Sequence, residues 1–167
     1  MNIAIIYHSH SGSTEKLAKL VEVRLTEVGH AISLIKLQTD VPVIGGTIRQ
    51  PMNFKVTNLP ELSTFDAYCI GGPVWAFGPN PVTYKAILQM DDLQKKNALP
   101  FVTMGFPLVG MGGKSALKHM SKAIAEKNGN PLPGIIVPKM FHNFDLEMEK
   151  AVSNCMGYFE DYPAAHP

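Results

Sequence analysis

Short apolar runs alternate along this chain with longer segments in which apolar residues recur at helical spacing. Residues 2–7, Asn-Ile-Ala-Ile-Ile-Tyr, are almost continuously apolar, which is typical of a strand buried on both faces of a parallel sheet. Further strands are predicted at residues 31–37, 66–71, 99–104 and 135–137. Helices are predicted at residues 14–28, 82–89, 114–127 and 146–159. This alternation predicts a doubly wound α/β fold.

The link between the second and third predicted strands, Gln38 to Phe65, interrupts this alternation because no helical pattern fills it. It contains Gly45, Gly46 and several prolines, and only residues 59–62 indicate a short helix. Long loops without secondary structure in compact domains are usually functional or flexible. Two roles stay open for this link: a lid or subunit interface, and a plain surface excursion.

Composition and charge narrow the classes of function. The 167 residues suit one domain, residues 1–167, whose last residues, 160–167, are expected to fray. A formal net charge of +1 without a long charged block argues against nucleic acid or an anionic membrane as partner. No apolar run reaches the length of a membrane span, and no secretory leader precedes the first strand. A cytoplasmic protein is therefore expected.

A hydroxyl-rich loop follows the first predicted strand. It consists of Ser9, His10, Ser11, Gly12, Ser13 and Thr14. Short donors, a glycine that lets the backbone curl, and the start of a helix are what a phosphate group requires. The Gly-x-x-x-x-Gly-Lys and Gly-x-Gly-x-x-Gly patterns are absent, so the loop predicts one phosphate monoester. The alternative is a turn without ligand, in which Ser13 or Thr14 caps the helix.

The pattern from Ser9 to Thr14 resembles the FMN phosphate loop of the flavodoxin-like family, a hydroxyl-x-hydroxyl-Gly-x-Thr sequence after the first strand. The resemblance extends over nearly the whole chain, apart from the link Gln38 to Phe65. It implies a three-layer αβα domain with a five-stranded parallel sheet in the order 2-1-3-4-5. It also implies FMN as cofactor, at the carboxyl ends of the first and third strands.

A second candidate loop follows the third predicted strand. Its candidate residues are Pro73, Val74, Trp75, Ala76, Phe77 and Gly78. A flat ring system needs an aromatic or apolar wall and N–H donors at its polar edge, and this segment offers both. The segment resembles the second flavin-binding loop of flavodoxin-like quinone and flavin reductases. The alternative is that Trp75 and Phe77 simply pack beneath a loop.

A third, glycine-rich loop follows the fourth predicted strand. Its candidate residues are Met104, Gly105, Phe106, Gly110 and Gly112. The resemblance implies that backbone N–H groups here approach the redox-active side of the flavin ring. The loop lacks the acidic and tyrosine-rich composition of many dedicated flavodoxins, and a flexible linker is the alternative.

Two redox functions follow from the resemblance. One is reduction of a quinone, flavin or similar small acceptor by NADPH or NADH, with hydride transfer in a ping-pong sequence. The other is a flavodoxin-type one-electron carrier that docks on redox proteins. Carriers of this family are commonly strongly acidic, so a net charge of +1 favours the reductase. A homodimer suits that function, because family reductases often build their substrate pocket between subunits. A binding domain without redox turnover stays open as a third function.

No side chain is assigned a catalytic role, because the flavin would carry the chemistry. His8 and His10 are spaced like a pair of metal ligands, but no carboxylate or cysteine completes the set, so no metal is expected. Cys69 and Cys155 lie inside predicted elements and are expected to be ordinary core residues.

Overall fold

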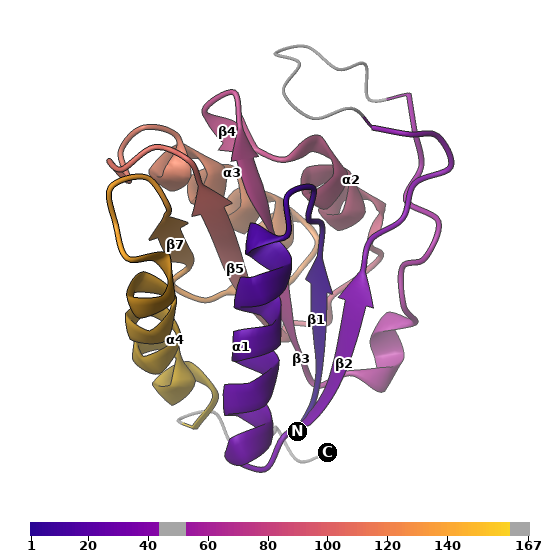
Figure 1. The fold of residues 1–167 in the computed structure, drawn as a ribbon. Coiled ribbons are helices and arrows are strands. Elements are labelled where there is room, and N and C mark those ends of the chain that lie inside the picture. Colours follow the sequence, from indigo (N-terminus) through magenta and orange to yellow (C-terminus); the bar gives the residue numbers. More distant parts are fainter. Residues whose placement is uncertain (44–52, 161–167) are drawn as a thin grey trace.

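The computed structural model describes residues 1–43 and 53–160. Its strands are β1 (Asn2–Tyr7), β2 (Ala31–Lys36), β3 (Ala67–Trp75), β4 (Gly78–Pro79), β5 (Asn97–Met104), β6 (Asn130–Pro131) and β7 (Ile135–Pro138). Its helices are α1 (Ser13–Glu27), α2 (Pro81–Gln89), α3 (Gly113–Glu126) and α4 (Phe144–Glu160), with a 3-10 helix, η1, at Leu62–Thr64. Helices α1 and α4 cover one face of the sheet, and α2 and α3 cover the other (Figure 1). The predicted α/β class and its three layers are confirmed.

The sheet has the predicted strand order. It runs β2-β1-β3-β5, with β6 and β7 both beside β5, and all these pairs are parallel. The fifth position is therefore filled by two short strands, where the sequence predicted one. Pro131 and Pro133 lack the N–H group that a continuous ladder requires, which accounts for the break. Strand β4 adds a short antiparallel pair to β3.

The central strand β1 shows why its sequence is almost continuously apolar. Ile3 and Ile5 pack in the core beneath α1 and α4, whereas Ala4 and Ile6 pack in the core beneath α2 and α3. All four side chains are fully buried. A strand with a helical layer on each face has no solvent-facing side, so alternation between polar and apolar residues disappears.

The link between β2 and β3 is partly packed against the molecule. Phe54 and Val56 are buried in the core beneath α2 and α3. The Gln89 amide on α2 donates to the Val56 carbonyl at 3.1 Å and accepts from the Val56 N–H at 2.9 Å. The short helix indicated at residues 59–62 is found one turn later, as η1. The described end of the link is therefore anchored to the core, and this packing does not decide between the two roles that the sequence left open. Residues 44–52 lie outside the described residues, as do 161–167 of the expected frayed tail.

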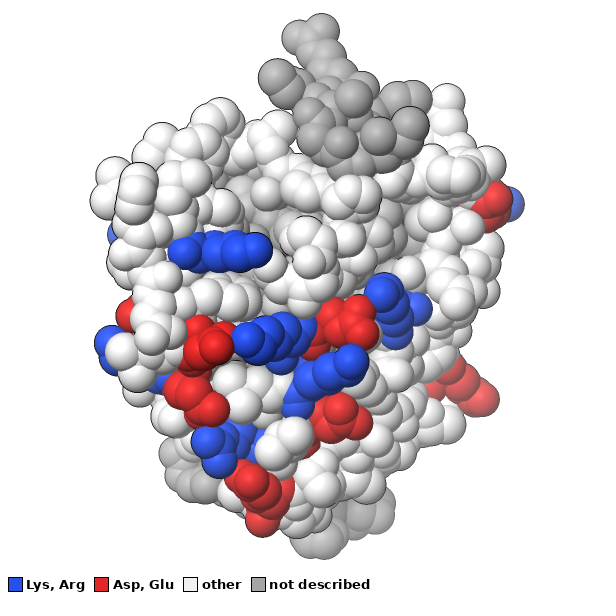
Figure 2. Space-filling model, in the orientation of Figure 1, with Lys and Arg blue, Asp and Glu red and all other residues white. Residues whose placement is uncertain are grey.

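Charged side chains of both signs are interleaved over α1 and α4 (Figure 2). Lys16 pairs with Asp145 at 2.5 Å, and Arg24 pairs with Glu149 at 2.8 Å, so these contacts join the two helices. The part of this face near the ends of β5 and β7 is almost free of acidic side chains. Among the helices of residues 1–43 and 53–160, none has the length and apolar character to cross a membrane.

Candidate functional site

The three candidate loops meet at the carboxyl edge of the sheet, as the strand order requires (Figure 1). The His8 N–H donates to the Gly71 carbonyl at 3.0 Å, which joins the first loop to β3. The Trp75 ring lies edge-on to both imidazoles, 5.8 Å from His8 and 6.3 Å from His10 between ring centroids. Residues far apart in sequence thus form one surface.

The first loop leaves the start of α1 without a side-chain cap. Gly12 is the N-cap residue, at φ 85°, and no side chain accepts from the helix N-terminus. The expectation that Ser13 or Thr14 caps the helix is therefore wrong. Only glycine adopts this left-handed backbone without strain, so Gly12 turns the chain into α1. The first N–H groups of α1 are left for an acceptor from outside the helix.

The hydroxyl groups of the first loop have different surroundings. Thr14 is buried, and its Oγ1 lies 2.7 Å from the Thr103 Oγ1 on β5, in a contact that fixes α1 to the sheet. The Ser9 Oγ is buried and has no hydrogen-bond partner among the described residues. Ser11 is exposed. A buried hydroxyl without a partner is costly, and a ligand oxygen would satisfy it.

The second candidate loop is a β-hairpin. β3 continues to Trp75, beyond the predicted end at residue 71, and pairs antiparallel with β4 around a two-residue turn. Ala76 and Phe77 form that turn at φ 47° and 65°. The Asn80 carboxamide then caps α2 by accepting from the Val82 N–H at 2.9 Å. Positive φ at two residues that are not glycine stores strain in a site that tertiary contacts must hold.

The third loop packs against this hairpin. The Phe77 and Phe106 rings stack at 6.0 Å between centroids and 20° between planes. At Gly112, φ is 104°, and a Cβ would lie 2.7 Å from the Phe77 Cα, so only glycine fits there. Gly110 has open space around it.

A cleft of about 80 Å³ lies between the hairpin and the third loop. Its walls are Val74, Ala76, Phe77, Met104, Gly105, Phe106 and Met111. Whole ligand pockets usually enclose roughly 300 Å³ or more, so this cleft has room for one edge of a flat ring. The cleft thus brings part of the second loop together with part of the third, whereas the candidates Pro73 and Trp75 do not line it.

Electrostatically, the site lacks acidic groups. Residues 8–12, 73–80, 105–112 and 139–143 contain no Asp or Glu. Burial lowers the pKa of the His8 imidazole to about 4, with further lowering by His10 and Lys36. His8 is therefore neutral at physiological pH. In the described part of the chain, no group of three or more His, Cys, Asp or Glu side chains could hold a metal ion.

Sequence reasoning missed two polar residues at this edge. Thr103 lies in the apolar strand β5. Lys139 follows β7, and the Lys139 Nζ donates to the Ser13 Oγ at 3.3 Å. A hydroxyl side chain at the end of an apolar run was the local signal that could have indicated Thr103. Nothing local indicated Lys139, because the contact spans 126 residues.

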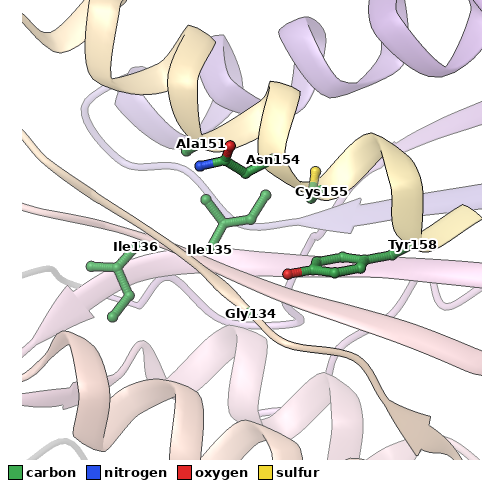
Figure 3. A pocket seen from close by; sticks show the side chains of 7 residues that line it. All are labelled: Gly134, Ile135, Ile136, Ala151, Asn154, Cys155 and Tyr158. Carbon is green, nitrogen blue, oxygen red and sulfur yellow. The ribbon is translucent and has the colours of Figure 1, made fainter.

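A separate cavity of about 260 Å³ lies between α4 and the chain around β7 (Figure 3). Gly134, Ile135 and Ile136 form one wall, and Tyr158 reaches toward Ile135 from α4. Burial raises the pKa of the Cys155 thiol to about 12, so it is not a nucleophile at neutral pH. The cavity includes none of the candidate residues and is not part of the candidate site.

Comparisons with known proteins agree with this geometry at the level of the fold. No protein-family model and no curated protein sequence matches the chain. The structure of oxidised Flavodoxin 2 from Bacillus cereus is 18% identical, with a TM-score of 0.69, over 97% of this chain and 100% of that one. A Fusobacterium nucleatum flavodoxin bound to flavin mononucleotide is 10% identical, with a TM-score of 0.63, over 97% and 99%. A flavodoxin, WrbA-like protein from Agrobacterium tumefaciens is 16% identical, with a TM-score of 0.55, over 93% and 98%. The chain therefore has the flavodoxin-like fold that its sequence predicted.

Proposed function

We propose that this chain binds FMN at the carboxyl edge of its sheet and reduces a small quinone, flavin or similar acceptor with electrons from NADPH or NADH. The observation that carries the FMN assignment is the buried Ser9 hydroxyl without a partner, beside a helix that lacks a side-chain cap. A phosphate oxygen would satisfy the hydroxyl, and the N–H groups of α1 would face the same anion. The residues present therefore fit the phosphate end of FMN.

The ring end of FMN would lie against the apolar part of the site. Trp75 and the cleft between the hairpin and the third loop would provide an aromatic wall, and the exposed backbone at Gly105 and Gly110 would be open to the ring, whereas Gly112 is buried against Phe77. Bound flavin supplies the capacity to accept a hydride and pass electrons on. The chain would orient the ring, exclude water from one edge, and present the neutral His8 imidazole near it.

The exposed aromatic side chains at the site favour a small apolar molecule as the electron acceptor. Phe77 and Phe106 are 57% and 46% exposed, so a flat molecule has aromatic faces on which to stack. A one-electron carrier is the second candidate, and its support is the likeness to flavodoxin structures along almost their whole length. The loops around the site lack the carboxylates with which an acidic carrier would bind a basic partner. This difference favours the reductase.

The test is reconstitution with FMN followed by anaerobic mixing with NADPH or NADH. We expect FMN to bind and its visible absorbance to bleach within seconds. Ser9→Ala should weaken FMN binding on the order of tenfold, because a hydrogen bond to a charged group is lost. Ser63→Ala, in η1, should leave binding unchanged.

Failure of the wild-type chain to bind FMN would overturn the proposal. If FMN binds and dithionite reduces it, but neither nicotinamide does, the reductase assignment is wrong and the carrier remains. Reduction by dithionite shows in that case that the bound flavin is redox-active.

A further inference from the structure

The position of Lys139 is set by the register of the sheet. Met104 pairs with Pro138 where β5 and β7 end, and the Lys139 N–H then donates to the Met104 carbonyl at 2.9 Å. The Met140 N–H continues this pattern to Gly105 at 3.1 Å. The backbone at Lys139 is therefore held at the carboxyl edge, beside the start of the third loop.

The start of α1 is held at the same place from the other side. The buried contact between Thr14 and Thr103 fixes the first turn of α1 to β5, one residue before Met104. Two anchors on adjacent residues of β5 thus bring the Lys139 ammonium to the first turn of α1, where it donates to the Ser13 Oγ at 3.3 Å.

The Lys139 ammonium also differs from the other lysines around α1. Lys16 pairs with Asp145, whereas Lys19 and Lys36 both pair with Glu15. In the described part of the chain, Lys139 has no carboxylate within ion-pair distance, and the side-chain atom to which it donates is the neutral Ser13 hydroxyl. It is a cation whose charge no carboxylate of the described chain compensates, and it lies at the first turn of α1, which directly follows the hydroxyl-rich loop.

A phosphate monoester carries nearly two negative charges at neutral pH. The helix N-terminus offers only about half a positive charge, and the loop hydroxyls offer none. We propose that Lys139 is the counter-cation of the FMN phosphate, and that it makes the site select FMN over riboflavin. This inference rests on the proposed function and adds a binding residue that the loop sequence does not contain.

The test is titration of the apo-protein with FMN and with riboflavin, followed by flavin fluorescence, for the wild type and three variants. Lys139→Gln should weaken FMN binding on the order of five- to tenfold and leave riboflavin binding unchanged. Lys139→Arg keeps the charge and should restore FMN binding to within about twofold of the wild type. Lys16→Gln makes the same change in net charge and should leave the preference for FMN unchanged, because Lys16 already pairs with Asp145.

Salt provides a second readout, because the wild-type preference for FMN should shrink at about 1 M salt while riboflavin binding stays constant. If FMN binds and Lys139→Gln retains the wild-type ratio of FMN to riboflavin affinity, Lys139 is not the counter-cation and the proposed function stands. An equal loss in Lys16→Gln would also refute the assignment, because the effect would then be long-range. If neither flavin binds to the wild type, both proposals fail.

Discussion

The half-buried imidazole of His8 makes the stability of this fold depend on pH in a specific way. Above about pH 6.5 the imidazole is neutral in both the folded and the unfolded chain, so it contributes no difference. Below that pH the unfolded chain takes up a proton that the folded protein excludes until about pH 4. The unfolded chain then binds more protons, and the free energy of unfolding falls as the pH falls from about 6.5 to 4.

The magnitude follows from the size of the shift. Lowering the His8 pKa from 6.5 to about 4 corresponds to a loss of about 2 kcal/mol between pH 7 and pH 5. Because His8 is only partly buried, solvent screens the charge and about 1 kcal/mol is the realistic value. Urea unfolding of the apo-protein at both pH values, followed by circular dichroism, measures this loss.

His8→Gln removes the titrating group and serves as the control. We expect the wild type to lose about 1 kcal/mol more than this variant between pH 7 and pH 5. An equal loss in both proteins would show that other groups carry the pH dependence. A pKa for His8 near 6.5, measured by NMR in the folded protein, would refute the reasoning directly.

Two further predictions concern packing around the site. Gly71→Ala would place a Cβ 2.1 Å from the buried Phe101 ring, so we expect the free energy of unfolding, measured in urea, to fall by about 1–3 kcal/mol. At Gly157 on α4 a Cβ meets no atom within 4 Å, so Gly157→Ala should raise it by about 0.5–1 kcal/mol. Equal effects at the two positions would contradict this. Thr103→Val leaves the Thr14 hydroxyl buried without its partner and should cost about 1–3 kcal/mol, whereas adding Thr14→Val should recover part of that loss. Strictly additive losses in this double-mutant cycle would show that the two hydroxyls are not coupled.

The sequence predicted elements well where burial alone determined the pattern. The helix predicted over residues 14–28 is found at Ser13–Glu27, and the strand predicted over 99–104 at Asn97–Met104. The helix buries one stripe of its surface and the strand is buried on both faces, so the spacing of their apolar residues is unambiguous. The strand order came from the family resemblance, because periodicity does not say which strands are neighbours.

The hairpin after β3 was missed for a physical reason. Turns with two positive φ angles normally carry Asn or Gly, and this chain has Ala76 and Phe77 there. Contacts from the third loop hold this turn, since Gly112 approaches the Phe77 Cα closely. Local propensity gave no signal because the turn is determined by tertiary packing, and such exceptions concentrate at functional sites.

The site depends on β5 more than the loop sequences indicate. Thr103 holds the first turn of α1, Met104 holds the backbone at Lys139, and the third loop begins at Gly105. Three consecutive residues thus position the proposed phosphate cradle, its proposed counter-cation and the proposed ring contacts. The hydroxyl-rich loop provides donors, but the end of β5 sets their geometry. A substitution there that leaves the fold intact should therefore alter phosphate recognition and ring contacts together, whereas one in the first loop should alter phosphate recognition alone.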